Sequence, residues 1–98
     1  MPGWTDAHNH LQDPRLGNPA PVIAAMRAAG VERCVVNATR ESDWPQVEAL
    51  ALMEPDFVFP AFGIHPWQAH TATAGWQDRL AGLLEKHPQA SLGECGLD

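Results

Sequence analysis

The sequence has little cysteine, and the two that it has are not paired. Cys34 and Cys95 stand singly inside apolar stretches rather than at the spacings of a disulfide framework or a metal-binding cysteine motif. This usage argues against a disulfide-stabilised scaffold. It predicts that both thiols are buried and that the compartment is reducing.

Long apolar runs are also absent. No stretch approaches the roughly 20 apolar residues that a membrane helix needs, and no basic segment followed by an apolar one opens the chain. The sequence therefore predicts neither membrane insertion nor secretion, and a cytoplasmic location is expected.

Positive charge is scarce as well. The 98 residues contain one lysine and five arginines and have a formal net charge of −6. This is the wrong sign for a broad phosphate-binding face. If the partner is a nucleic acid or another phosphate, a local cation must overcome that field. The apolar content of 45% is otherwise that of an ordinary globular domain.

What the chain does contain is a regular alternation of short apolar strands and helices. Strands are expected within residues 4–11, 31–39, 56–66 and 90–98, and helices within residues 16–30, 42–55 and 73–88. Asn18 and Ser42 are the expected helix caps. The expected core-facing residues of the helices are Val22, Met26 and Ala29, then Trp44, Val47, Leu50 and Ala51, then Trp76, Leu80, Leu83 and Leu84.

Strands that are apolar on both faces and alternate with helices predict an α/β fold with a parallel sheet and right-handed crossovers. The strands recur about every 25 to 35 residues, and a (β/α)8 barrel needs about 31 residues per unit. About three and a half βα units fit into residues 1–98. The chain is therefore expected to form the N-terminal portion of a TIM barrel, with a small open doubly wound sheet as the alternative.

The first strand is unusual because it carries ionisable side chains. On a regular strand Asp6, His8 and His10 share one face, while Ala7, Asn9 and Leu11 lie on the other. Two imidazoles at this spacing can reach one ion, and an aspartate stands beside them. The pattern predicts a metal site more readily than a pair of hydrogen-bonded core histidines.

Other ionisable residues come at the ends of later strands. The carboxyl ends of parallel strands meet at one edge of the sheet, so His65, Glu94 and Asp98 are expected near His8 and His10. Glu94 stands between glycines, and its carboxylate is expected to bind the metal rather than an arginine.

His65 is expected to contact substrate, although it could simply cap a turn before Pro66. Trp67 could stack on a planar group such as a base. His70 and His87 are assigned no functional role. His70 lies in a polar loop, and the helix dipole accounts for His87 at the end of a helix.

Three stretches, "DAHNHLQD", "FGIHPW" and "GECGLD", in this order and at these separations, resemble the TatD family of metal-dependent hydrolases. The resemblance implies a TIM barrel, one or two divalent ions (zinc, magnesium or manganese) and cleavage of phosphodiester bonds, with DNA as the expected substrate. It implies that His8 and His10 are metal ligands and that Glu94 binds or bridges the ions. It places His65 at the substrate mouth, and Asp6 and Asp98 as groups that orient ligands.

The resemblance also implies two further histidine ligands and an aspartate on later strands, which the 98 residues do not include. A catalytically inactive N-terminal fragment of a deoxyribonuclease is therefore expected. Two alternatives remain open at this stage. One is an amidohydrolase acting on C–N or ester bonds, and the other is a non-catalytic fragment that binds metal or self-associates through exposed sheet edges.

Overall fold

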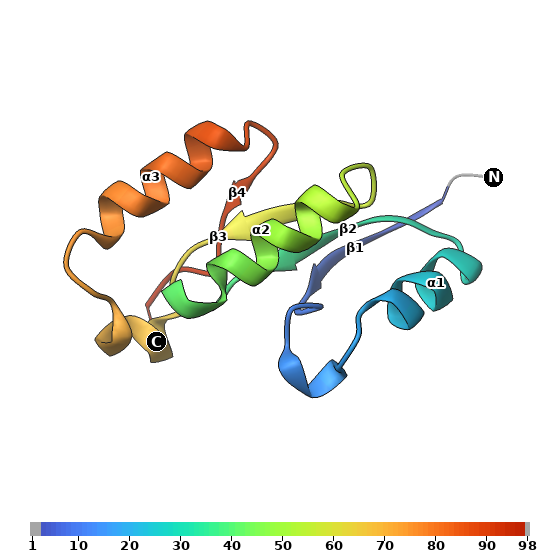
Figure 1. Ribbon diagram of the computed structural model, residues 1–98, viewed down its shortest axis with the longest axis horizontal. Helices are drawn as coiled ribbons and strands as arrows, with labels where there is room; N and C mark the ends of the chain where they lie inside the picture. The colour runs from blue at the N-terminus through green and yellow to red at the C-terminus, as the bar shows by residue number, and fades with distance from the viewer. Residues whose placement is uncertain (1–2, 98) are drawn as a thin grey trace.

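Four parallel strands follow one another across a single sheet in chain order. The computed structural model describes residues 3–97, so Asp98, which was expected to orient metal ligands, lies outside the described residues. The strands are β1 (Trp4–Asn9), β2 (Val31–Asn37), β3 (Val58–Phe62) and β4 (Ser91–Leu92), in the order β1-β2-β3-β4 (Figure 1).

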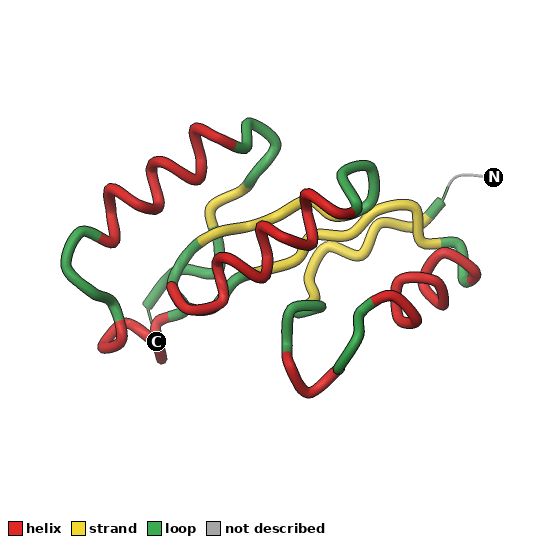
Figure 2. Tube along the Cα trace, viewed as in Figure 1, coloured by secondary structure: helices red, strands yellow, loops and turns green. Residues whose placement is uncertain are grey.

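Helices alternate with these strands along the chain (Figure 2). They are α1 (Ala20–Ala28), α2 (Trp44–Met53) and α3 (Trp76–Lys86), and the 3-10 turns are η1 (Pro14–Leu16), η2 (Glu41–Asp43) and η3 (Pro66–Thr71). The strand order has no reversal, and a doubly wound sheet would require one. Right-handed crossovers that all step in one direction place the helices on one face of the sheet. The expectation of the first part of a TIM barrel is thus confirmed.

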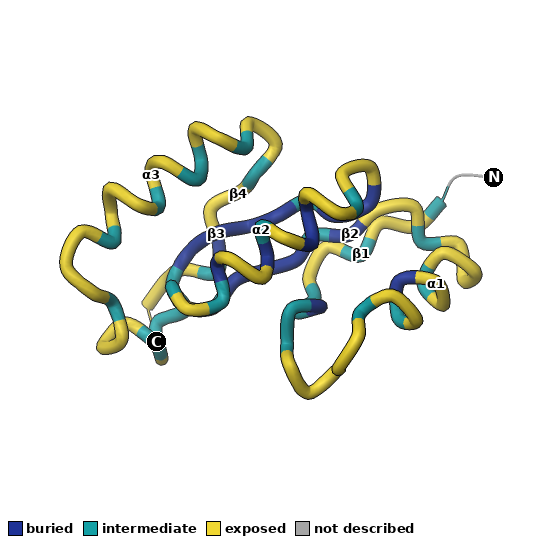
Figure 3. The backbone as a smooth tube through the Cα atoms, in the orientation of Figure 1, coloured by how far each residue is buried: buried dark blue, intermediate teal, exposed yellow. Residues whose placement is uncertain are grey.

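The core lies between α2 and the middle of the sheet (Figure 3). Its largest fully buried side chains are Phe57, Phe62, Val36, Val47, Val58 and Cys34. On α2 the predicted face is correct, since Trp44, Val47, Leu50 and Ala51 are all buried. This helix holds the loop after β2 in place, and that loop borders the candidate site.

The other two helices pack less closely than their sequences predicted. On α1 the buried residue is Ile23, whereas Ala29, predicted to face the core, is exposed. The α1 segment is apolar nearly all round, so its periodicity does not identify one face. The predicted apolar face of α3 does contact the core, but its four residues are only partly buried.

One expected helix cap is wrong and one is confirmed in part. Ser42 lies inside η2, and the backbone of this loop is held instead by the Asp43 carboxylate, which accepts from Thr39 N at 3.1 Å. Asn18 Oδ1 accepts from Ala20 N at 3.0 Å, although the residue that directly precedes α1 is Pro19. A short turn thus replaces the expected direct start of α2.

Two burial predictions are wrong. Cys34 is buried as expected, but Cys95 is exposed because it follows the short β4, where the chain has left the sheet. In β2 only the second half is buried, and Glu32 and Arg33 are exposed. The longest helix within residues 3–97, α3, has 11 residues, and no helix there is long and apolar enough to span a membrane.

Candidate metal centre

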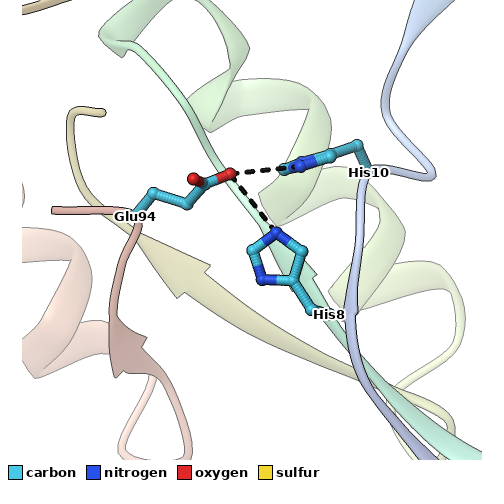
Figure 4. Close-up of side chains that lie close together, drawn as sticks. All are labelled: His8, His10 and Glu94. Atoms are coloured by element: carbon cyan, nitrogen blue, oxygen red, sulfur yellow. Dashed lines mark ion pairs between the residues drawn. The ribbon is translucent and has the colours of Figure 1, made fainter. Parts of the chain in front are cut away.

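His8, His10 and Glu94 bring three potential ligand atoms together (Figure 4). The histidines come from the end of β1 and the glutamate from the segment after β4. Glu94 Oε2 lies 3.5 Å from His8 Nε2 and 3.1 Å from His10 Nε2. The two imidazole rings meet edge to face, with centroids 4.9 Å apart. The structure thus places the three predicted metal ligands within 4.8 Å of one another.

Glu94 reaches the histidines although β1 and β4 lie at opposite edges of the sheet. After β4 the chain turns back across the ends of the strands. Gly93 N donates to Phe62 O at 3.0 Å, at the end of β3, and Glu94 N donates to Ala38 O at 2.9 Å, just beyond β2. These two backbone bonds carry the carboxylate toward β1.

Gly63 makes this return possible. A Cβ atom at position 63 would lie 2.3 Å from the carbonyl oxygen of Glu94, far inside van der Waals contact with a backbone atom. The carbonyl of Gly63 accepts from Trp44 Nε1 at 2.8 Å, so α2 fixes this point of the chain. Only glycine allows the two backbone segments to approach so closely.

The orientation of His10 is set by a backbone carbonyl. His10 Nδ1 lies 2.8 Å from the carbonyl oxygen of Asn37, which can only accept a hydrogen bond. The proton of the neutral ring is therefore on Nδ1, and the lone pair of Nε2 faces Glu94. A lone pair and a carboxylate oxygen 3.1 Å apart repel each other unless a proton or a cation lies between them.

The donor set fits a divalent metal ion. Bonds of about 2.0 to 2.2 Å in a tetrahedral site hold neighbouring nitrogen and oxygen ligands roughly 3.3 to 3.6 Å apart. The separations of 3.1 and 3.5 Å lie close to this range. Two imidazoles and one carboxylate suit zinc or manganese and leave coordination positions open for further ligands.

His65 caps a turn and also faces the candidate site. Its Nδ1 accepts from Trp67 N at 3.1 Å and caps η3, which is the turn-capping interpretation. Because a backbone N–H can only donate, the proton of the neutral ring is on Nε2. That nitrogen lies 3.7 Å from Glu94 Oε1, so His65 also faces the candidate site. Trp67 is 69% exposed, and its ring meets the His65 ring edge-on.

Asp6 supports the backbone of β1 rather than an imidazole. Its carboxylate accepts from His8 N at 3.2 Å and from Asn9 Nδ2 at 2.9 Å. The strand pairing is irregular between Asp6 and Asn9, so the strict alternation that put Asn9 on the opposite face does not hold. The expected orienting role of Asp6 would therefore act through the main chain of His8.

A hydrogen-bonded chain that the sequence did not reveal runs from His10 to the loop after β2. The carbonyl of Asn37 also accepts from Gln12 Nε2 at 2.8 Å, and the same amide donates to Asp43 Oδ2 at 3.0 Å. Asn37 is the buried polar residue at the end of β2, only 7% exposed. In the sequence, the only indication of this role is that a polar residue, Asn37, ends an apolar strand.

The nearby ionisable groups outside this cluster have structural explanations. Arg15 holds the half-buried Asp13 carboxyl by hydrogen bonds and lowers its pKa to about 2. Burial raises the pKa of the Cys34 thiol, which therefore stays protonated and unreactive. His70 is exposed on η3, and His87 packs against Glu48 of α2. Neither histidine belongs to the metal cluster.

Sequence comparison places this geometry beside known nucleases. The family described as TatD related DNase matches residues 5–98. A "3'-5' ssDNA/RNA exonuclease TatD" of Edwardsiella piscicida is 33% identical over 82 residues, 84% of this chain and 32% of that protein. A protein of the same name from Pantoea ananatis is 34% identical over 77 residues, 79% of this chain and 30% of that protein. The chain spans about a third of the length of these curated relatives.

Proposed function

The chain belongs to the TatD-related DNase family, and on this premise we propose that it carries part of a divalent-metal site for phosphodiester hydrolysis in nucleic acid, with DNA as the expected substrate. The observation that carries the proposal is the convergence of His8, His10 and Glu94. In this proposal the three residues hold one or two ions of zinc, magnesium or manganese, with Glu94 able to bridge them.

When bound, a divalent ion withdraws charge from a phosphoryl oxygen and makes water more acidic. The residues of the chain supply the geometry for this chemistry. Asn37 O keeps the proton of His10 on Nδ1, so that Nε2 remains a ligand. Asp6 holds the main chain of His8. The main chain of Glu94 is held by its hydrogen bond to the carbonyl of Ala38.

His65 is the proposed substrate-binding residue. With Nδ1 engaged by Trp67 N, its Nε2–H points toward Glu94 Oε1 over a distance too long for a hydrogen bond. The N–H is therefore available to donate to a phosphate oxygen at the mouth of the site. Asp98 is proposed, on the family pattern alone, to orient a ligand.

Activity of the whole protein needs more than these residues. The chain spans about a third of the length of the relatives named as exonucleases, and the metal ligands of residues 3–97 leave coordination positions open. We therefore expect the 98-residue polypeptide to bind metal and nucleic acid without cleaving it. We also propose that the protein is located in the cytoplasm.

Two measurements test the proposal. A fluorescent single-stranded oligonucleotide should bind the 98-residue chain more tightly with Mn²⁺ present than with EDTA, and the Glu94→Gln variant should lose this difference. Joining the chain to the remaining two thirds of the Edwardsiella piscicida relative should give metal-dependent cleavage that Glu94→Gln abolishes. Equal oligonucleotide binding with and without Mn²⁺ would contradict the metal-centred function.

A further inference from the structure

One cation of the described chain is left without an acidic partner. The six lysines and arginines all lie within residues 3–97, and five of them form ion pairs there, namely Arg15, Arg27, Arg33, Arg79 and Lys86. Arg40 forms none within that part of the chain, and its side chain is exposed. In a molecule with a net charge of −6, this is the local cation that a phosphate-binding role requires.

Arg40 lines an open cavity of about 720 Å³ that His10 also lines. The cavity thus begins at a proposed metal ligand and extends along the loop after β2. A nucleic-acid strand with one phosphate at the metal position would therefore have this cavity beside it. Arg40 is therefore placed where it can contact a bound substrate.

The acidic groups of the cavity are already occupied. Asp13 accepts from Arg15 through both carboxylate oxygens, at 3.1 Å for Oδ1 and 2.6 Å for Oδ2. Asp43 accepts from Thr39 N, Thr39 Oγ1 and Arg40 N, and from the Gln12 amide. Arg15 neutralises the charge of Asp13, and neutral donors already bind both oxygens of Asp43, whereas the guanidinium of Arg40 has no acidic partner within residues 3–97.

The same bonds hold Arg40 in place. Its backbone N–H donates to Asp43 at 3.3 Å, and Asp43 is joined through Gln12 to the Asn37 carbonyl that orients His10. One network of hydrogen bonds therefore connects the loop that carries Arg40 to the proposed metal ligand His10. A guanidinium is also the side chain best suited to two parallel bonds with phosphate oxygens.

From these observations we propose that Arg40 and the cavity beside His10 form a second phosphate subsite, which binds a phosphate group of a single-stranded nucleic acid next to the one at the metal position. The identity of the strand rests on the proposed function. The binding of a phosphate group by Arg40 does not.

The test uses the 98-residue chain freed of metal with EDTA, with a parallel oligonucleotide titration in Mn²⁺, and compares Arg40→Gln with Arg33→Gln. Arg33 is an exposed arginine on β2, the strand that precedes the loop of Arg40, and its one ion pair is a 3.8 Å contact with Glu32. Its substitution therefore controls for the loss of one surface charge. The probes are a single-stranded oligonucleotide and inorganic pyrophosphate. Affinities are measured across a range of salt concentrations, and circular dichroism checks that both variants fold alike.

For Arg40→Gln we expect oligonucleotide affinity to fall about tenfold, as for loss of a hydrogen bond to a charged group. The slope of log affinity against log salt should decrease by about 0.7, the value for one phosphate contact on a single strand. Pyrophosphate binding should weaken as well, while Arg33→Gln changes neither probe's affinity beyond a small common charge effect. Uptake of Mn²⁺ should be the same in both variants.

The outcomes separate this inference from the proposed function. If the oligonucleotide binds in a metal-dependent way but Arg40→Gln and Arg33→Gln behave alike, the subsite is wrong and the function stands. If only pyrophosphate binds and its binding needs Arg40, the subsite stands and the nucleic-acid function is wrong. Failure of both probes to bind the unmodified chain would overturn the subsite.

Discussion

At the scale of single residues, the candidate centre depends on backbone atoms as much as on its ligands. The carbonyl of Asn37 determines which nitrogen of His10 faces Glu94, and the carbonyl of Ala38 holds the main chain of Glu94 itself. Neither contact can be removed by changing a side chain directly. The geometry is therefore most sensitive where the backbone segments touch.

Gly63→Ala tests this dependence without removing a ligand. The added methyl would lie 2.3 Å from Glu94 O, so the segment that carries the carboxylate must move. We expect metal affinity to fall by about 10- to 100-fold, the range for loss of a partner that orients a ligand. Isothermal titration with Zn²⁺ or Mn²⁺ measures it.

Gly82→Ala is the matched control. Gly82 lies in α3, and nothing surrounds the position of its missing Cβ within 4 Å. Alanine there should leave metal affinity unchanged and stabilise the helix by up to about 1 kcal/mol. Unchanged metal affinity in Gly63→Ala would show that the close approach does not position Glu94.

At the scale of elements, one carboxylate joins α2 to the end of α3. Glu48 of α2 bonds to His87 Nε2 at 2.6 Å and to Lys86 Nζ at 3.0 Å. The hydrogen bond from His87, followed by the one from Lys86, lowers the pKa of Glu48 below its usual 4.5. His87 was expected to interact with the helix dipole alone, so the glutamate partner is an addition that the sequence did not reveal.

Glu48→Gln should destabilise the chain by about 1.5 to 3 kcal/mol at pH 7, the range for hydrogen bonds to a charged group. Because the folded pKa of Glu48 is lowered, this contribution is fully present above pH 4.5, declines below it, and is lost as the pH falls through the lower pKa of the folded state. The melting temperatures of the two proteins should therefore converge in acid. Thermal unfolding at pH 7 and pH 3 measures the difference.

Glu85→Gln serves as the control for this pair, since Glu85 is exposed on α3. Its melting temperature should follow that of the unmodified chain at both pH values. A difference between Glu48→Gln and the unmodified chain that is equally large at pH 3 would exclude the ion pair as its cause.

The sequence predicted the order of elements because strand and helix periods are local signals. The face of α2 and the His8–His10 pair follow from spacing within a few residues. The role of Asn37 depends on a contact with His10, 27 residues away in the sequence, and the requirement for Gly63 comes from backbone of the segment after β4. The exposed Cys95 was missed because the apolar pattern does not show how short β4 is.

At the scale of the whole molecule, apolar surface remains open at both edges of the sheet. Trp4 on β1 is 72% exposed and Leu92 on β4 is 58% exposed, and each edge strand has one unpaired side. Unpaired edges with apolar side chains pair readily with other chains. We therefore expect a polypeptide of these 98 residues to self-associate, which sedimentation velocity would detect as species larger than the 10.7 kDa monomer.

Lysine at the two edges should reverse this behaviour. The double variant Trp4→Lys/Leu92→Lys should sediment mainly as a monomer, because charged edge residues oppose strand pairing. Leu52→Lys, which replaces a leucine of α2 that is 62% exposed, is the control and should self-associate like the unmodified chain. Equal monomer fractions in the two variants would exclude the sheet edges as the interface.

The central claim is that His8, His10 and Glu94 form one metal site, and metal binding by His10→Ala tests it most directly. Titration with Zn²⁺ or Mn²⁺ should show saturable binding by the unmodified chain. His10→Ala should lower the affinity by more than the roughly 10- to 100-fold expected for loss of an outer hydrogen-bond partner. His70→Ala, which removes an exposed histidine of η3 outside the cluster, should bind as the unmodified chain does. Equal affinity in His10→Ala and the unmodified chain would contradict the claim.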